Sequence, residues 1–391
     1  MNLGTVEASL GLADAERHLR EGAVLARKIG RPYLEVRCLA QLGSASKTRP
    51  FTTTRRRCRE AIAFAERHGW GAEWMIAPAL VTLADTMVWT GQFDEAERWL
   101  QRAARALHTD TGPDKGLMLH KTTGMLEAAR GRNREALEEF SAAEYLQAQL
   151  ERSHATASQV TGWMLATRAR LGMTGEASAA LAALSDEQAA SGELGNARAV
   201  ICLAQRDPAG ALGAVRDVLD GTAPVTGYVT VVEAHLMAGL AHRELGDQRA
   251  ANQAAERALA LAEADRLVLP FAMTDSRDLL EALPAHHTAH AALRADILGV
   301  LHGSSPPVRD LYPAPPAGQL SPGELRVLRY LPTNLSRPQI AGELSVSLNT
   351  IDTHVRRIYA KLQVRDRSAA VQRARDLRLL AAARTPSPAI T

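Results

Sequence analysis

Cysteine is scarce in this sequence. Its three cysteines, Cys38, Cys58 and Cys202, lie far apart and form no CxxC pair. Three isolated cysteines do not suggest a disulfide framework or a zinc site. We therefore expect a cytoplasmic protein with free thiols.

Long apolar runs and aromatic residues are also rare. No apolar run approaches the roughly 18 residues that a membrane span requires, and the start lacks the pattern of a signal peptide. Aromatic residues make up only 4% of the chain, while alanine, leucine, arginine and glutamate dominate, which favours helix over sheet. We expect an all-α fold, and 391 residues that are 46% hydrophobic suffice for more than one domain.

The motifs of common enzyme classes are missing as well. The stretch Gly112-Pro-Asp-Lys-Gly is too short for a phosphate-binding GxxxxGK[ST] loop and lacks the following Ser or Thr. We find no nucleophile elbow, HExxH motif or glycine-rich dinucleotide loop. His286, His287 and His290 suggest a metal site, but without converging Cys or carboxylates a solvated turn is the preferred interpretation. We expect no enzyme activity, no cofactor and no metal.

The chain does contain a recurring turn, from its start to about His302. A glycine is followed five residues later by an alanine that opens an amphipathic helix, as in Gly91 and Ala96. The further copies are Gly131 with Ala136, Gly172 with Ala177, Gly246 with Ala251, and a degenerate one, Arg206 with Ala211. These five marker alanines stand 40, 41, 34 and 40 residues apart, a period that suits two antiparallel helices per unit.

The residue types of this turn have a physical basis. Glycine adopts the left-handed conformation that ends a helix, and a small alanine lets two helix backbones approach closely. The segments resemble tetratricopeptide repeats, although most spacings exceed the usual length of about 34 residues. We expect a tetratricopeptide-like α-α solenoid over 1–302. Five tryptophans could line its concave face, but we prefer inter-repeat core for them (Trp70, Trp74, Trp89, Trp99 and Trp163).

Composition changes abruptly after the repeats. Five prolines fall within 303–319, so helix cannot continue and a semi-extended linker is expected there. The following segment, 320–380, holds eleven Lys or Arg and five Asp or Glu, whereas the rest of the chain holds 35 basic and 38 acidic residues. This segment would meet a polyanion, unless it is a basic surface without a partner. We expect disorder in the tail, 381–391.

Helix caps predict four helices in 320–380. Ser321 with Glu324, and Ser336 with Gln339, have the spacing of capping boxes, and Pro322 occupies a first helical position. Ser347 would cap a third helix that runs to about Leu362, and Asp366 a fourth. The second helix would pack Ile340, Ala341 and Leu344 inward. Short turns between these helices predict a compact trihelical domain with one added helix.

The third helix has two distinct faces. One is an apolar stripe that would face the core: Leu348, Ile351, Val355, Ile358 and Leu362. The opposite face has short polar side chains followed by cations, which suits a helix that enters the major groove. The candidate DNA-binding residues are Asn349, Thr350, Asp352, Thr353, Arg356, Arg357 and Lys361, with Ser336 and Arg337 of the second helix near the phosphates. An ordinary amphipathic bundle with a polar surface is the alternative.

The segment resembles the C-terminal domain of LuxR-type regulators. The match runs without a gap through Leu320-Ser-Pro, Glu324, Val327-Leu328, Leu335-Ser336, Gln339-Ile340-Ala341, Leu344, Val346-Ser347, Asn349-Thr350-Ile351, Thr353-His354-Val355, Ile358-Tyr359, Lys361-Leu362, Val364 and Arg367. This resemblance implies that the third helix is the recognition helix on double-stranded DNA. It also implies that the last helix, 368–375, pairs with its twin in a homodimer on an inverted repeat.

Asp352 departs from that pattern, since many relatives carry Lys there. Its carboxylate could accept a hydrogen bond from cytosine N4, or pair with Arg356 four residues on, which we prefer.

The whole architecture resembles the large MalT-like ATP-dependent regulators without their nucleotide-binding module. The chain would then be a shortened relative, or begin inside a longer reading frame. The resemblance implies that the repeats sense a small-molecule inducer or a partner protein, with RNA polymerase as a further potential partner. The alternative function is a solenoid scaffold whose C-terminal module binds protein rather than DNA.

Overall fold

The computed structural model describes residues 2–45, 51–107, 112–283, 290–303 and most of 320–376. All regular secondary structure in these ranges is helical, so the predicted all-α fold class is confirmed. The chain divides into two compact units, 1–308 and 309–391.

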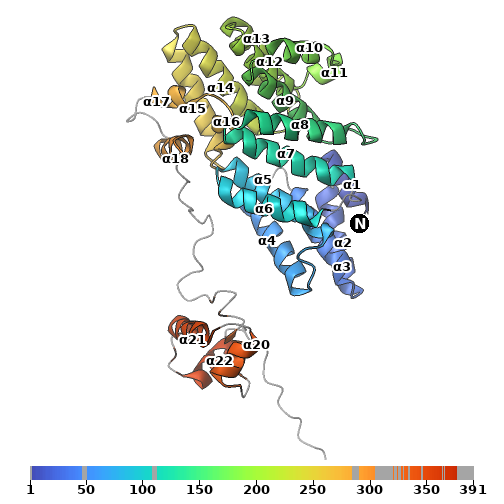
Figure 1. The fold of residues 1–391 in the computed structure, drawn as a ribbon, viewed down its shortest axis with the longest axis vertical. Helices are drawn as coiled ribbons and strands as arrows, with labels where there is room; N and C mark the ends of the chain where they lie inside the picture. Colours follow the sequence, from blue (N-terminus) through green and yellow to red (C-terminus); the bar gives the residue numbers. More distant parts are fainter. Residues whose placement is uncertain are drawn as a thin grey trace, which may run out of the picture. The chain divides into compact units, whose positions relative to one another are not determined.

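Helices of the first unit follow one another as hairpins joined by short turns (Figure 1). They are α1 (Asn2–Leu10), α2 (Ala15–Lys28), α3 (Pro32–Ser44), α4 (Phe51–Arg67), the 3-10 helix η1 (Trp74–Ile76), α5 (Ala77–Trp89), α6 (Phe93–Ala106), α7 (Pro113–Ala129), α8 (Asn133–Gln147), α9 (Ala157–Arg170), α10 (Thr174–Ala182), α11 (Asp186–Ala189), α12 (Gly192–Ala204), α13 (Pro208–Leu219), α14 (Tyr228–Glu244), α15 (Gln248–Ala262), α16 (Leu269–Ala272), α17 (Arg277–Glu281) and α18 (Ala291–Leu301).

The recurring turn has the geometry that its residues predict. The marker glycines adopt the left-handed conformation, with φ of 78° at Gly91, 74° at Gly131, 82° at Gly172 and 80° at Gly246. In the degenerate copy Arg206 adopts it too, with φ of 63°. All five marker alanines are fully buried: Ala96, Ala136, Ala177, Ala211 and Ala251. The turn therefore ends one helix and brings the next against it.

Tryptophans contribute to the core between hairpins. Trp89 and Trp163 are 5% and 6% exposed, and their ring centroids lie 5.9 Å apart. The other three, Trp70, Trp74 and Trp99, are partly buried and pack against the same core. The structure thus supports the inter-repeat interpretation.

In the second unit the described helices are α20 (Arg337–Glu343), α21 (Leu348–Leu362) and α22 (Arg367–Asp376). Helical residues at Glu324, Val327, Leu328 and Tyr330 precede them. The core is built from all of these parts: Leu320, Val327, Leu328, Leu331, Ile340, Ala341, Ile351, Val355, Ile358, Leu362, Ala370 and Ala374. Leu344 packs against it, as predicted.

Leu348 is a correction to the predicted apolar stripe, because 45% of it is exposed. It is the first residue of α21. A helical side chain lies over the turn that precedes its own Cα, and here that turn is the loop before the helix rather than the core. The stripe therefore begins at Ile351.

Several predictions fall outside the described residues. These are the linker over 303–319 except for Gly303, the tail over 381–391, the cap residues Ser321 and Pro322, and the histidines 286 and 287. His290 lies within them, with its Nδ1 3.2 Å from Glu263 Oε2. The part of the chain that the structure describes holds no cluster of three or more His, Cys, Asp or Glu side chains suited to a metal ion. None of its helices is long and apolar enough to cross a membrane.

Candidate nucleic-acid interface

Caps position α20 and α21 as the sequence predicts. Ser336 and Gln339 form a capping box, in which the Ser336 backbone N–H donates to Gln339 Oε1 over 2.8 Å. Ser347 Oγ accepts from the Thr350 backbone N–H at 3.1 Å and lies 2.7 Å from Thr350 Oγ1. Asp366 caps α22 by accepting from the Ala369 backbone N–H at 2.8 Å. These bonds fix where each helix of the motif begins.

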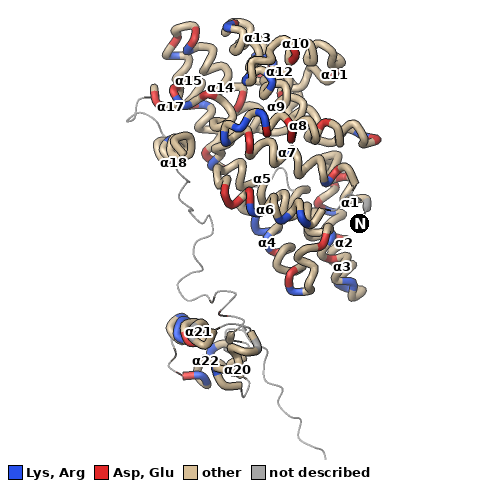
Figure 2. Tube along the Cα trace, in the orientation of Figure 1, with Lys and Arg blue, Asp and Glu red and all other residues tan. Residues whose placement is uncertain are grey.

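The buried side of α21 determines which residues lie on its exposed side. Ile351, Val355 and Ile358 are at most 2% exposed, so the helix cannot rotate about its axis without exposing them. Arg356 and Arg357 are exposed, and neither forms an ion pair with any residue that the structure describes. Figure 2 shows this concentration of basic residues on α21. The two guanidinium groups are therefore available to an anionic partner.

Arg337 and Asp352 form an ion pair between α20 and α21. Arg337 Nη1 donates to Asp352 Oδ1 over 2.9 Å, with the side chains 51% and 36% exposed. The expected pair of Asp352 with Arg356 is therefore wrong. Arg356 lies one turn further along the same helix, whereas the start of α20 places Arg337 beside the carboxylate. The ion pair neutralises one predicted phosphate-binding cation in the free protein.

Lys361 is directed toward the first helical segment. Its Nζ lies 2.8 Å from Glu324 Oε2, and the Glu324 side chain is 2% exposed. Glu324 was expected in a helix cap and Lys361 at DNA, and the ion pair between them was not predicted. Lys361 thus compensates a buried carboxylate, a role that stabilises the unit.

Arg367 is a structural residue to which sequence reasoning gave no role. Its Nε donates to the Leu331 carbonyl at 2.8 Å and its Nη2 to the Tyr330 carbonyl at 3.1 Å. These bonds tie the start of α22 to the end of the first helical segment.

The structure brings Ser336, Arg337 and Asp352 together at the start of α20, and places Thr353, Arg356 and Arg357 further along α21. Thr353 is partly exposed. Asn349 is helical, but its side chain lies outside the described residues. The candidate residues whose side chains are described therefore form two groups, one at the start of α20 and one along α21. Lys361, which faces Glu324, and Thr350, whose hydroxyl lies beside Ser347, belong to neither.

Comparison with known proteins identifies this unit. The family described as "Bacterial regulatory proteins, luxR family" matches residues 318–374. Among curated proteins, the probable transcriptional regulatory protein NarL from Mycobacterium tuberculosis strains CDC 1551 / Oshkosh and ATCC 25618 / H37Rv is 49% identical over 67 residues. That match covers 17% of this chain and 31% of each relative, so the chain spans about a third of their length. The C-terminal unit of this chain is a helix-turn-helix domain of the luxR family.

Proposed function

We propose that the protein is a sequence-specific DNA-binding transcriptional regulator that reads the major groove with α21. The observation that carries this proposal is the pair of exposed arginines, Arg356 and Arg357, on the outer face of a luxR-family helix. Guanidinium groups bind phosphates and can donate two hydrogen bonds to guanine. The NarL relatives are named probable transcriptional regulatory proteins, which agrees with this function.

The second part of the proposal is a homodimer on an inverted repeat, paired through α22. Two-fold symmetric helix-turn-helix dimers place their recognition helices in successive major grooves, about one helical turn apart. The first unit would receive the signal, an inducer or a partner protein, and contact with RNA polymerase would give the output. This assigns the protein to the cytoplasm.

Selection from a randomised duplex pool by the full chain, at about 50 and 200 mM salt, tests the proposal. We expect an inverted repeat to be enriched. Two arginines per subunit, four in a dimer, predict a slope of about −4 in log affinity against log salt. No binding at the lower salt would contradict the proposal and favour the protein-binding scaffold.

Arg356→Ala tests whether this side chain reads a base. We expect it to weaken binding by about 1–3 kcal/mol, and unequally between related sites. Equal weakening on every duplex would assign Arg356 to phosphate instead. Arg105→Ala, which removes an exposed arginine of α6 in the first unit, is the matched control and should leave affinity unchanged.

A further inference from the structure

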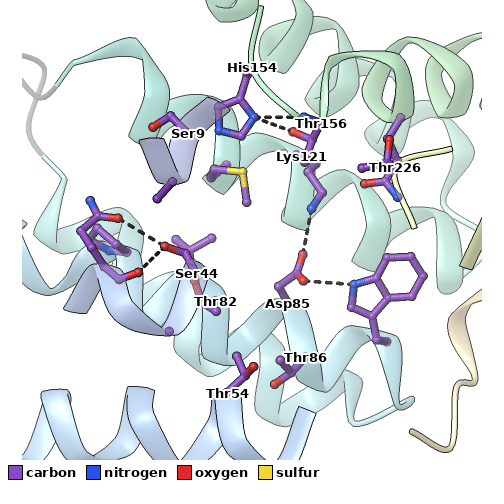
Figure 3. A pocket seen from close by; sticks show the side chains of 18 of the residues that line it. Ser9, Ser44, Thr54, Thr82, Asp85, Thr86, Lys121, His154, Thr156 and Thr226 are labelled. Atoms are coloured by element: carbon purple, nitrogen blue, oxygen red, sulfur yellow. Dashed lines mark hydrogen bonds and ion pairs between the residues drawn. The ribbon is translucent and has the colours of Figure 1, made fainter. Parts of the chain in front are cut away.

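A cavity of about 200 Å³ lies inside the first unit (Figure 3). Its wall comes from α1, α3, α4, α5, α7, α9 and α14 and from the segments that lead into α9 and α14. A cavity of about 150 Å³ in a protein core can bind benzene, so this one has room for a slightly larger organic molecule. The helices that enclose it are separated by up to about two hundred residues of sequence, so only the folded repeats create it.

An ion pair forms one side of this cavity. Lys121 Nζ donates to Asp85 Oδ1 at 3.1 Å, and the Lys121 side chain is 5% exposed. The other oxygen of Asp85, Oδ2, accepts from Trp89 Nε1 at 3.0 Å. Both oxygens of this carboxylate are therefore occupied by the protein, and its position is fixed.

Lys121 has hydrogen-bonding capacity that the protein does not use. An ammonium group has three N–H donors, and Asp85 is the acceptor that the described residues provide. Figure 3 shows the Lys121 side chain on the cavity wall, between Asp85 and the loop that carries His154 and Thr156. Each buried N–H that lacks an acceptor is unfavourable, so a molecule that fills the cavity gains by offering an oxygen to a remaining N–H of Lys121.

The other residues of the wall indicate the chemistry of the rest of the ligand. Phe51, Val81 and Met118 contribute apolar surface. The hydroxyls of Thr54 and Thr82 have no hydrogen-bond partner among the described residues and could bind a polar substituent. Such a mixture, mostly apolar with a few converging polar groups, is typical of small-molecule sites.

Charge compensation argues against an ionic ligand. Lys115 is the second lysine on the wall, and its Nζ lies 3.3 Å from Asp114 Oδ1. Both lysines, Lys115 and Lys121, therefore already have a carboxylate beside them. A charged ligand would lose its hydration without finding an uncompensated counterion. An uncharged molecule avoids this penalty.

We propose that this cavity binds a small uncharged organic molecule, mostly apolar, whose oxygen accepts a hydrogen bond from Lys121. This gives the sensing role of the first unit a site and a ligand class. The sensing role rests on the proposed function, whereas the binding of a ligand does not. Binding itself can be measured on the full chain without DNA, so failure of one proposal is distinguishable from failure of the other.

Three probes of nearly the same shape separate the contributions of the hydrogen-bond acceptor and of the ligand's charge to binding. Acetophenone offers an uncharged carbonyl oxygen, ethylbenzene offers no acceptor, and benzoate offers an anionic one. The Met118 methyl group on the wall reports occupancy when the full chain carries ¹³C-methyl methionine and is titrated with each probe. We expect saturable binding of acetophenone, about 10-fold tighter than that of ethylbenzene and tighter than that of benzoate.

Variants assign this preference to Lys121. Lys121→Met should remove the advantage of acetophenone over ethylbenzene. The double variant Asp85→Asn, Lys121→Met serves the same purpose without an uncompensated carboxylate, should the single variant fail to fold. Lys28→Met, at an exposed lysine of α2, is the matched control and should bind like the parent. Thr82→Phe should fill the cavity and abolish binding of all three probes.

Three results would overturn the proposal. Tightest binding of benzoate would make the cavity an anion site. Equal binding of acetophenone and ethylbenzene would show that Lys121 donates nothing to the ligand. No saturable shift of the Met118 methyl up to about 10 mM of any probe would rule out a site for this class of molecule.

Discussion

Two cations of the helix-turn-helix are held by carboxylates, and two are not. Arg337 pairs with Asp352 and Lys361 with Glu324, whereas Arg356 and Arg357 form no ion pair with a described residue. At the residue scale, this division decides which side chains can give up their present contact for DNA. An exposed pair such as Arg337 with Asp352 contributes about 0–1 kcal/mol, little compared with binding to a phosphate.

Asp352→Asn should therefore change DNA binding through Arg337. The substitution removes the carboxylate that competes with phosphate for this guanidinium. We expect higher affinity at low salt and a salt slope that is steeper by about one unit per subunit. Anisotropy titrations over a range of salt concentrations measure both. In an Arg337→Ala background the same substitution should have no effect on the slope, and an unchanged effect there would show that Asp352 acts on DNA directly.

Residue contacts were the hardest feature to predict. Helical periodicity placed Ile351, Val355 and Ile358 correctly in the core, because burial follows from a repeat within one helix. The partners of Asp352 and Lys361 lie 15 and 37 residues away in sequence, on other helical segments. Periodicity within one helix contains no information about such contacts.

At the scale of the element, the recurring turn shows how local sequence fixes a hairpin. The marker glycines were predicted correctly because left-handed backbone is a local requirement. Arg206 is informative since it meets this requirement with a side chain, at φ of 63°. Arg206 Nη1 lies 3.8 Å from Glu244 Oε1, and 86% of the Arg206 side chain is exposed. Such an exposed ion pair compensates little of the backbone strain.

Arg206→Gly should stabilise the first unit. Glycine adopts φ near 60° without the steric penalty of a Cβ atom, and we expect a gain of about 0.5–1 kcal/mol in the free energy of unfolding. Urea denaturation measures it. Gly131→Ala, at a marker position where a Cβ would meet no atom within 4 Å, should have the opposite sign for the same reason. A destabilising Arg206→Gly would mean that the arginine side chain has a favourable contact outweighing its backbone strain.

The carboxyl of Glu233 in α14 contacts residues of two neighbouring helices, α9 and α12. Burial raises the pKa of its carboxyl from 4.5 to about 7, even though Trp163 Nε1 and Asn196 Nδ2 donate to it over 3.1 and 3.4 Å and lower the pKa. The folded protein then holds a proton that the unfolded chain has already lost between about pH 4.5 and 7. Stability from this group is complete below pH 4.5 and is lost as the pH rises through 7.

Comparison with Glu233→Gln isolates this effect, because glutamine does not titrate. Between pH 5 and pH 8 the parent should lose about 1–3 kcal/mol of unfolding free energy relative to the variant. The range extends down to about 1 kcal/mol because the Glu233 residue is only partly buried, which weakens the effect. Urea denaturation at several pH values measures the difference. Parallel pH profiles would show that Glu233 is ionised in the folded protein at all these pH values.

At the scale of the whole molecule, the chain has two units with separate cores. The recurring hairpin turns and the position of the luxR-family unit could be predicted from the sequence, because caps, turns and charge are local features. The cavity could not, since Asp85, Lys121 and Thr226 come together only when successive hairpins stack. Cavities of this kind depend on the angle between repeats, which composition and spacing leave open.

Separate cores predict separate unfolding transitions. Lys361→Met leaves Glu324, 2% exposed, without its cation, and should lower the stability of the second unit by about 1–3 kcal/mol, because Lys361 is itself about one third exposed. Calorimetry of the full chain should show a lower midpoint for this unit and an unchanged one for the first. Arg356→Met, on the same helix but exposed, is the control and should shift neither. A shift of both transitions by Lys361→Met would mean that the units unfold together.

The burial of every marker alanine also has a genetic consequence. Each turn joins helices by the same geometry, so the 40-residue segment from Gly91 to Arg130 could be lost as one block. Thr90 would then precede Gly131, another left-handed glycine, and Ala136 would take the place of Ala96 against the preceding helix. Unequal recombination between such repeats can thus lengthen or shorten the array while preserving each junction, so relatives of this protein should differ in length by whole hairpins.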